Sequence, residues 1–330
     1  MNPSPKHARP QNPAYVRAEA ELFDRYGLTV TSRPLELTRP PMRLRLVQVG
    51  DGEPVLFLHG FGHCVAAWAP LTKHLSNVRS LMLDLPGHGG ADPVDFRGVD
   101  LRKWFNALLL SCLDELGLEK VCLVGHSQGG MFALWLALAA PERVRSVVVI
   151  GTPAVAFGAR IEALRFLTWR GLGKLLFWMP KPRHAYRNIL AGTLGRAAVE
   201  AFPDLVTATY LATHRPGFAR TAYTEMRELF RGVDAEPRRY ALADSELLTI
   251  TQPVLVLWGE GDTRFQATAY AQARAALMPR GRFEVMPGDH TPWLDDPAGC
   301  ARRIAAAVTS PFLPKSQSLA GSPGVRPGEL

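Results

Sequence analysis

The sequence predicts an α/β fold: a mostly parallel, eight-stranded sheet with helices on both faces and a helical insertion. Three short apolar runs of the 330-residue chain carry this prediction, at 54–58, 79–84 and 120–124. Each run ends in a turn that contains glycine with histidine or proline, and the chain between the runs has the residue pattern of helices. Short apolar strands that alternate with helices are typical of parallel sheets with crossover helices.

The start of the chain predicts one short helix. Residues 1–13 are rich in proline and poor in apolar residues, which favours disorder. Residues 14–26 fit an amphipathic helix with Val16, Leu22 and Phe23 on its apolar side. We expect the apolar side of this helix to pack against the domain; the alternative is that the helix covers an entrance to the domain.

Two β-rich segments precede the first apolar run, at 30–37 and 43–49. Polar and apolar residues alternate in the second segment, which predicts a half-exposed antiparallel strand. The remaining elements of this part of the core are expected as helices 65–76, 100–116 and 128–140 and strand 144–150.

The pattern changes after residue 153. From about 154 to 250 there is no β-rich run, and segments rich in leucine, alanine, arginine and aromatic residues are broken by prolines. This composition predicts a helical insertion between two core strands. The sheet is expected to resume and end with strands 253–258 and 282–286, helices near 265–278 and 298–308, and a disordered tail.

The composition favours an intracellular protein. Hydrophobic residues make up 47% of the chain, yet no run approaches the roughly 18–20 apolar residues of a membrane span, and the start lacks the apolar core of a signal peptide. The four cysteines lie far apart, which fits a reducing compartment, so we expect a cytoplasmic protein. The net charge of +8 comes from dispersed basic residues, so we expect no nucleic-acid partner.

The segment 121–131 indicates chemistry. Four apolar residues lead into Gly125-His126-Ser127-Gln128-Gly129, and a helix-forming apolar run follows. Glycines on both sides let strand and helix approach closely while Ser127 takes a strained conformation with its hydroxyl exposed. This G-x-S-x-G spacing predicts that Ser127 is a nucleophile.

With its other motifs, the chain resembles the α/β-hydrolase-fold serine hydrolases. The motifs occur in the family's order over roughly 42–310: His59-Gly-Phe-Gly62, Asp84-Leu-Pro-Gly-His-Gly89, Gly125-His-Ser-Gln-Gly129, Trp258-Gly-Glu-Gly-Asp262 and Gly288-Asp-His-Thr-Pro-Trp293. The resemblance implies that the insertion is the family's cap. The expected division is an N-terminal extension with a short helix (1–28), the first part of the core (29–152), the helical cap (153–250), the second part of the core (251–312) and the disordered tail (313–330).

A nucleophilic serine needs a base within hydrogen-bond reach, and the base needs an acid that orients it. The resemblance implies the chain order serine, acid, histidine, with each partner on a loop at the carboxyl end of a strand. Among the nine histidines, His290 fits the base. Asp262 is the expected acid, and its neighbour Glu260 is the alternative.

Attack on a carbonyl places negative charge on its oxygen, which backbone N–H groups usually stabilise. The resemblance implies that one donor is the N–H of the residue after the nucleophile, Gln128. The second donor is expected in the loop after strand 54–58. We assign it to the N–H of Phe61, with Gly62 as the alternative.

Substrate contacts are expected from the cap and from the loops that carry His63, Trp68 and Trp293. The cap is rich in aromatic side chains, which fit either the roof of an apolar pocket or the core of the cap itself. These are Phe157, Phe166, Trp169, Phe177, Trp178, Phe202, Tyr210 and Phe218.

The other histidines of the motifs have structural interpretations. His59 and His88 belong to turns where a ring commonly braces the loop by hydrogen bonding, and His126 is expected to pack beside the elbow. The His, Asp and Glu residues show no recognisable ligand spacing, so we expect no metal and no cofactor.

A serine at the elbow distinguishes this chain from the dehalogenases and epoxide hydrolases of the fold, which carry aspartate, and from dienelactone hydrolases, which carry cysteine. We therefore expect hydrolysis of an ester, lactone or related acyl bond of a small, largely apolar substrate through an acyl-enzyme. The alternatives are a C–C bond hydrolase acting on a diketone, a cofactor-free perhydrolase, and a ligand-binding member of the fold without catalysis.

Overall fold

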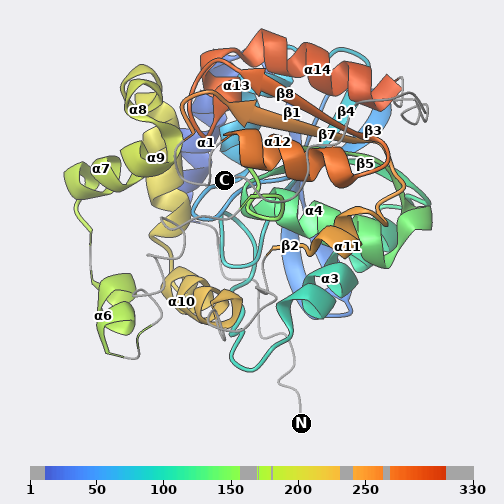
Figure 1. Cartoon of the computed structure of the whole chain (residues 1–330). Helices are drawn as coiled ribbons and strands as arrows, with labels where there is room; N and C mark the ends of the chain where they lie inside the picture. Colours follow the sequence, from blue (N-terminus) through green and yellow to red (C-terminus); the bar gives the residue numbers. More distant parts are fainter. Residues whose placement is uncertain are drawn as a thin grey trace, which may run out of the picture.

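A computed structural model describes residues 12–156, 169, 171–179, 181–230, 241–262 and 268–309 (Figure 1). The expected disordered ends, 1–11 of the proline-rich start and the tail 313–330, lie outside the described residues. Within the described part of the chain, no helix combines the length and apolar character needed to cross a membrane.

The sheet has eight strands in the order β1-β2-β4-β3-β5-β6-β7-β8. The strands β1 and β2 form an antiparallel hairpin, β2 pairs antiparallel with β4, and all later pairs are parallel. The bounds are β1 Val30–Thr38, β2 Pro41–Val49, β3 Glu53–Leu58, β4 Val78–Asp84, β5 Val121–His126, β6 Val144–Ile150, β7 Val254–Gly259 and β8 Gly281–Met286. The predicted mostly parallel, eight-stranded sheet is confirmed.

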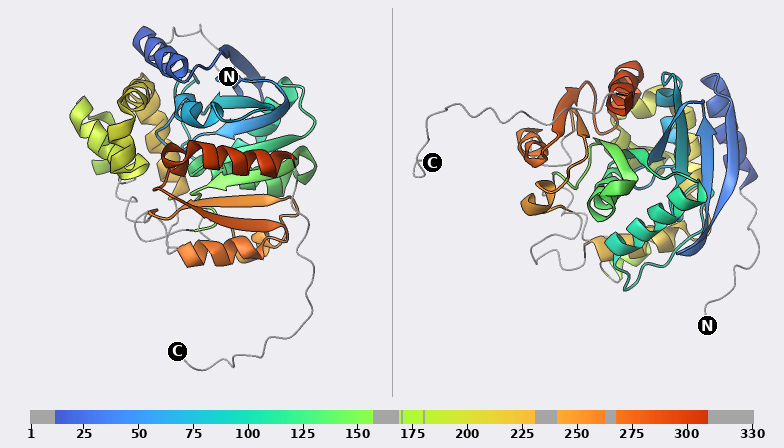
Figure 2. Two further views of the ribbon diagram at one scale, coloured as in Figure 1. Left: turned by 90° about the horizontal axis from the view of Figure 1, so that it is seen from above. Right: turned by 90° about the vertical axis from the view of Figure 1, so that its right-hand side faces the viewer.

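Helices cover both faces of the sheet, and two apolar cores result (Figure 2). In β3, Leu56 and Leu58 face one core, whereas Val55 and Phe57 face the other, because successive side chains point to opposite faces. The first core is closed by α3 (Leu101–Glu115), α4 (Gln128–Ala139), α11 (Asp244–Leu247) and α12 (Thr268–Leu277). The second is closed by α1 (Pro13–Arg25), α2 (Ala69–Thr72) and α14 (Pro297–Thr309).

The apolar side of α1 differs from the prediction. Val16 is 41% exposed, whereas Leu22 and Phe23 are buried as expected. Tyr15 and Glu19 complete the buried side, because positions 15, 19, 22 and 23 follow the helical spacing of one face. The buried side of α1 therefore includes a charged residue.

Two further expectations need correction. The strand β2 is not half-exposed: Val47 and Leu46 are both buried although they face opposite cores, and Arg45 is buried with them. The helix expected at 65–76 is a 3-10 turn, Val65–Trp68, followed by the single turn α2. The chain then turns into β4 through Asn77, which has φ +57°.

The described chain between β6 and β7 forms helices and turns, as predicted for the insertion. The helices are α6 (Leu172–Trp178), α7 (Arg183–Leu194), α8 (Arg196–Ala201), α9 (Pro203–Thr213), α10 (Phe218–Leu229) and α11. Figure 1 shows α6 to α10 gathered along one flank of the core. α9 packs on α1, where Arg25 forms an ion pair with Asp204, and α10 packs on α3 and α6.

Candidate active site

Ser127 occupies the turn between β5 and α4. Its φ of +50° and ψ of −114° lie outside the regions that non-glycine residues usually adopt, and its backbone N–H donates to the Ile150 carbonyl (2.8 Å). A Cβ on Gly125 would come within 2.5 Å of the Gly129 carbonyl oxygen, and a Cβ on Gly129 would collide with the Leu58 carbonyl. The two glycines therefore permit the close strand-to-helix approach that exposes a side chain at the apex.

His290 and Asp262 meet at the carboxyl ends of the last strands. The His290 Nδ1–H donates to Asp262 Oδ2 over 2.6 Å, and both side chains are buried. Asp262 follows β7 and His290 follows β8, so parallel pairing brings both loops to one edge. Glu260 is exposed, so of the two candidate acids the structure places Asp262 against the ring.

Ser127 and this pair are connected indirectly, through Ile150, Gly151 and His126. Ile150, which accepts the Ser127 N–H, precedes Gly151, and a Cβ on Gly151 would lie 2.8 Å from His290 Nδ1. The ring of His126 lies 4.7 Å from that of His290, and its Nε2–H donates to the His290 carbonyl (3.2 Å). The described residues contain no hydrogen bond from the Ser127 hydroxyl to the ring. Contacts of this kind are often long before substrate binds.

Two neutral histidines brace the loop after β3. His59 Nε2 accepts the Leu85 N–H (3.0 Å), so its Nδ1 carries the proton that binds the Gly60 carbonyl (2.9 Å). His88 Nε2 accepts the Gly62 N–H (3.1 Å) in the same way. Burial lowers the pKa of His59 to about 4 and the pKa of His88 to about 3. The predicted bracing role of both rings is confirmed.

The hydrogen bond to His88 distinguishes the backbone N–H groups that were considered as oxyanion donors. Because the Gly62 N–H is committed to His88, it is the weaker of the two candidates in its loop. The Phe61 N–H has no acceptor among the described residues. Gln128 is the first residue of α4, and the first N–H groups of a helix have no intrahelical acceptor. The N–H groups of Phe61 and Gln128 are therefore available to a bound oxygen.

The three side chains expected to contact substrate lie in different surroundings. His63 is buried, with its ring 5.4 Å from that of His126. Trp68 and Trp293 are 0% exposed and stack at 4.8 Å, and Trp293 Nε1–H donates to the Ala67 carbonyl (2.8 Å). Because both tryptophans are fully buried, we expect them to pack beneath the site and not to contact the substrate.

The cap aromatics divide between packing partners. Phe218 lies with its ring 5.1 Å from His88, beside the loop that carries the candidate donors. Phe177 and Trp178 contact Tyr223, whereas Tyr210 stacks on His214. Phe157 and Phe166 lie outside the described residues.

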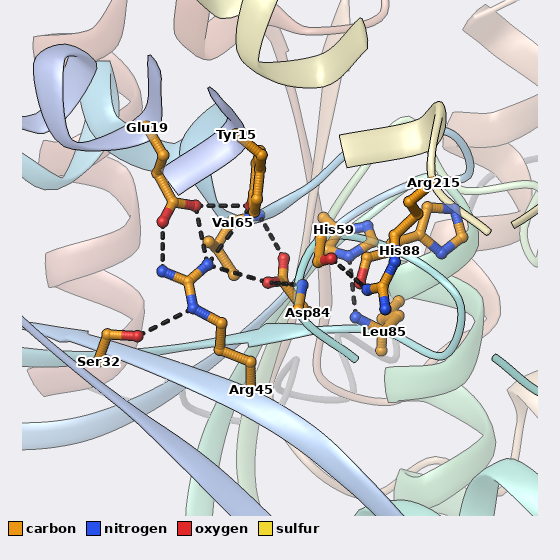
Figure 3. A network of polar contacts seen from close by, with 12 residues as sticks. Tyr15, Glu19, Ser32, Arg45, His59, Val65, Asp84, Leu85, His88 and Arg215 are labelled. Carbon is orange, nitrogen blue, oxygen red and sulfur yellow. Dashed lines mark hydrogen bonds and ion pairs between the residues drawn. The ribbon is translucent and has the colours of Figure 1, made fainter. Parts of the chain in front are cut away.

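A buried charge network that local sequence pattern does not reveal supports the same loops (Figure 3). Arg45 binds Glu19 from α1, Asp84 at the end of β4 (3.1 Å) and Ser32 (2.9 Å). Tyr15 donates to Glu19 over 2.7 Å. Burial raises the pKa of Glu19, and the guanidinium of Arg45 opposes that rise.

Asp84 connects this network to two loops of the site. Its Oδ1 accepts the Val65 N–H (3.1 Å), at the end of the loop that carries Phe61, and its Oδ2 accepts the Gly90 N–H (2.8 Å). Gly90 lies in the loop after β4. In the same loop, the carbonyls of His88 and Gly89 accept hydrogen bonds from Arg215 of the cap (Figure 3). The N-terminal helix, the core and the cap thus converge on the loops around the candidate site.

A second contact that sequence pattern does not reveal joins the cap to the elbow. The Gln128 side-chain amide donates to Glu225 of α10 over 3.0 Å, and Glu225 is buried.

Among the described residues, no group of three or more His, Cys, Asp or Glu side chains is arranged to hold a metal ion.

A serine at a strand-to-helix turn and a buried carboxylate–imidazole pair thus lie on loops of one mostly parallel sheet with a helical insertion. A sequence model described as "alpha/beta hydrolase fold" matches residues 53–297. The chain therefore belongs to the alpha/beta hydrolase fold family.

Relatives show similarity at moderate identity. A 2-hydroxy-6-oxononadienedioate/2-hydroxy-6-oxononatrienedioate hydrolase of Klebsiella pneumoniae is 27% identical over 238 residues, 67% of this chain and 75% of the relative. A 2-hydroxy-6-oxo-2,4-heptadienoate hydrolase of Pseudomonas putida is 30% identical over 226 residues, 66% and 75% of the two chains. The crystal structure of carboxylesterase CesB from Bacillus subtilis aligns with a TM-score of 0.68 and 20% identity, covering 88% of this chain and 96% of that one.

Proposed function

We propose that the protein is a serine hydrolase that cleaves an ester, lactone or related acyl bond of a small, largely apolar substrate. The observation that carries the proposal is the 2.6 Å hydrogen bond between His290 and Asp262. This pair packs against Gly151, and the neighbouring residue Ile150 accepts the Ser127 N–H. A buried carboxylate fixes the ring tautomer, so that Nε2 carries the lone pair that accepts a proton, and stabilises the imidazolium that forms.

In this mechanism the Ser127 oxygen attacks the substrate carbonyl while its proton passes to His290 Nε2. The carbonyl oxygen becomes an oxyanion that accepts from the N–H groups of Phe61 and Gln128. The intermediate collapses to an acyl-enzyme, and His290 returns the proton to the leaving alcohol. Water then gives a proton to His290 and attacks the acyl carbon, the bond to the Ser127 oxygen breaks, and His290 returns the proton to that oxygen as the acid leaves.

The test is turnover of a short p-nitrophenyl ester by the Ser127→Ala variant. We expect the loss of essentially all activity with an unchanged fold, because the Ser127 hydroxyl makes no hydrogen bond to another of the residues that the structure describes. Labelling of the wild type, and not of the variant, by a fluorophosphonate probe locates the nucleophile. Full turnover in the variant contradicts the assignment, and an unlabelled wild type favours a ligand-binding member of the fold.

A second candidate is hydrolysis of a C–C bond in a diketone. The names of the Klebsiella and Pseudomonas relatives, which cover about two thirds of this chain, favour it. A panel of esters, lactones, thioesters and vinylogous diketones separates the two, since the preferred class has the higher kcat/KM. Peroxide-dependent halogenation in acetate buffer tests the perhydrolase alternative.

We propose that the protein acts in the cytoplasm. We also propose that it binds a small-molecule substrate and has no nucleic-acid partner. The four cysteines are free and buried, and free thiols persist in reducing compartments. No cofactor is required by the mechanism above.

A further inference from the structure

A carboxyl group of the cap reaches the nucleophile elbow. Glu225 lies on α10 and is 2% exposed. Its Oε1 accepts a hydrogen bond from Gln128 Nε2 over 3.0 Å. Because Gln128 directly follows Ser127, this carboxyl lies within one glutamine side chain of the elbow.

The face of α10 that carries Glu225 is directed at the core. Thr221 and Thr224 accept the N–H groups of Val94 (2.8 Å) and Phe96 (3.0 Å), and Glu228 accepts the Gly98 N–H (3.0 Å). These side chains fasten the helix to the chain that leads into α3. Glu225 shares the face by helical spacing, yet it bonds to the first residue of α4 instead.

The carboxyl of Glu225 is costly where it lies. Burial raises its pKa to about 8, and the bond from Gln128 opposes that rise. An apolar side chain at this point would avoid the desolvation of a carboxyl group. Groups whose pKa burial shifts this far are concentrated at functional sites, and this one touches the residue next to the nucleophile.

Gln128 connects the Glu225 contact to the expected oxyanion site. Its backbone N–H begins α4 and is one of the two donors assigned to the oxyanion, and it belongs to the peptide unit that leaves the strained Ser127. A side chain anchored at its far end restricts rotation of the residue that carries it. Displacement of a donor by a fraction of an ångström weakens stabilisation of the transition state.

We propose that Glu225 is a positioning residue: its carboxyl group holds the Gln128 side chain from the cap and so keeps the Gln128 N–H aimed at the oxyanion. This role rests on the proposed serine hydrolase function. It also gives the cap a part in the chemical step.

The test compares Glu225→Leu and Glu225→Gln with the matched control Glu228→Leu, using kcat and KM for a short p-nitrophenyl ester. Glu225→Leu removes the acceptor, so we expect kcat to fall roughly tenfold with KM unchanged within about twofold. Glu225→Gln retains an acceptor oxygen and is expected to keep kcat within about threefold. Glu228→Leu breaks the bond to Gly98 and is expected to lower the melting temperature without that selective loss of kcat.

A double mutant shows whether Glu225 acts through Gln128. Gln128→Leu keeps the backbone N–H but removes the side-chain donor, so we expect the same loss of kcat as in Glu225→Leu. The double variant is then expected to be no slower than either single variant, because one contact is removed twice. Gln128→Leu tests the same bond from its other end if Glu225→Leu does not fold.

Three results overturn the positioning role: wild-type kcat in folded Glu225→Leu or Gln128→Leu, equal losses of kcat in the Glu225 and Glu228 leucine variants, or additive losses in the double variant. Each can occur while Ser127→Ala is inactive, and the serine hydrolase assignment then stands. A wild type without Ser127-dependent turnover overturns both proposals together.

Discussion

Gly151 lies directly against the imidazole of His290. A Cβ at this glycine would be 2.8 Å from Nδ1 and 3.2 Å from Asp262 Oδ2, closer than carbon normally approaches either atom. The absence of a side chain after β6 is what allows the loops after β7 and β8 to close over the strand end. The glycine therefore takes part in holding the carboxylate–imidazole pair.

Replacing Gly151 with alanine should displace the His290 ring. We expect kcat for a p-nitrophenyl ester to fall by roughly 10²-fold, the loss that a misplacement of about 1 Å can cause. The φ of +54° adds a backbone cost of about 1–2 kcal/mol, which denaturant unfolding measures. Gly117→Ala is the control, since Gly117 has φ +64° and open space around its Cβ. Equal kcat in the two variants contradicts the steric explanation.

Asp262→Asn should preserve the contact with His290 but favour the wrong ring tautomer. An amide that donates to Nδ1 leaves the proton on Nε2, which then cannot accept from Ser127. We expect kcat to fall by roughly 10⁴-fold, as the corresponding change does in a well-studied triad. Glu260→Gln should retain activity because Glu260 is exposed. Steady-state kinetics of both variants decide between the two acids.

The sequence predicted the strands because they depend on local features, whereas the expected order of serine, acid and histidine came from the resemblance to the family. Short apolar runs specify buried strands, and glycines mark the turns that follow them, so the loops carrying Ser127, Asp262 and His290 could be placed at one sheet edge. Parallel pairing of β5 to β8 then brings them together without further information.

Residues that pair over long distances could not be predicted in this way. Arg45 lies in a strand whose alternation suggests exposure, and its partner Glu19 carries a charge that by itself favours solvent. The one local signal was the spacing of Tyr15, Glu19 and Leu22 on the same helical face. Glu225 likewise belongs to no motif, because its contact with Gln128 depends on how α10 packs against the core.

The Arg45 network should be important for stability. Glu19→Leu removes one carboxylate from Arg45 and leaves Asp84 as its remaining ion-pair partner among the described residues, so we expect a cost of about 1.5–3 kcal/mol of unfolding free energy. Urea denaturation measures the loss. The control is Glu284→Gln, whose partly exposed pair with Arg303 should contribute about 0–1 kcal/mol. Similar costs for the two variants would show that α1 is not fastened through this network.

The neutral histidines of the braced loops should make the protein sensitive to acid. His59 and His88 have pKa values of about 4 and 3 in the folded state, below the 6.5 of the unfolded chain. Between these values the unfolded state binds more protons, so the stability that the neutral rings contribute is complete above pH 6.5 and is lost as the pH falls. Each ring should cost about 2 kcal/mol of unfolding free energy between pH 7.5 and pH 5.

Urea denaturation at both pH values, on the wild type and on His88→Gln, measures this contribution. The variant is less stable at pH 7.5 because the bond from the Gly62 N–H is altered, but its stability should fall by about 2 kcal/mol less on acidification than that of the wild type. His74→Gln, which replaces an exposed ring, is the control substitution. An identical dependence in wild type and His88→Gln would mean that His88 is already charged in the folded protein, and a charged ring has no lone pair with which to accept the Gly62 N–H.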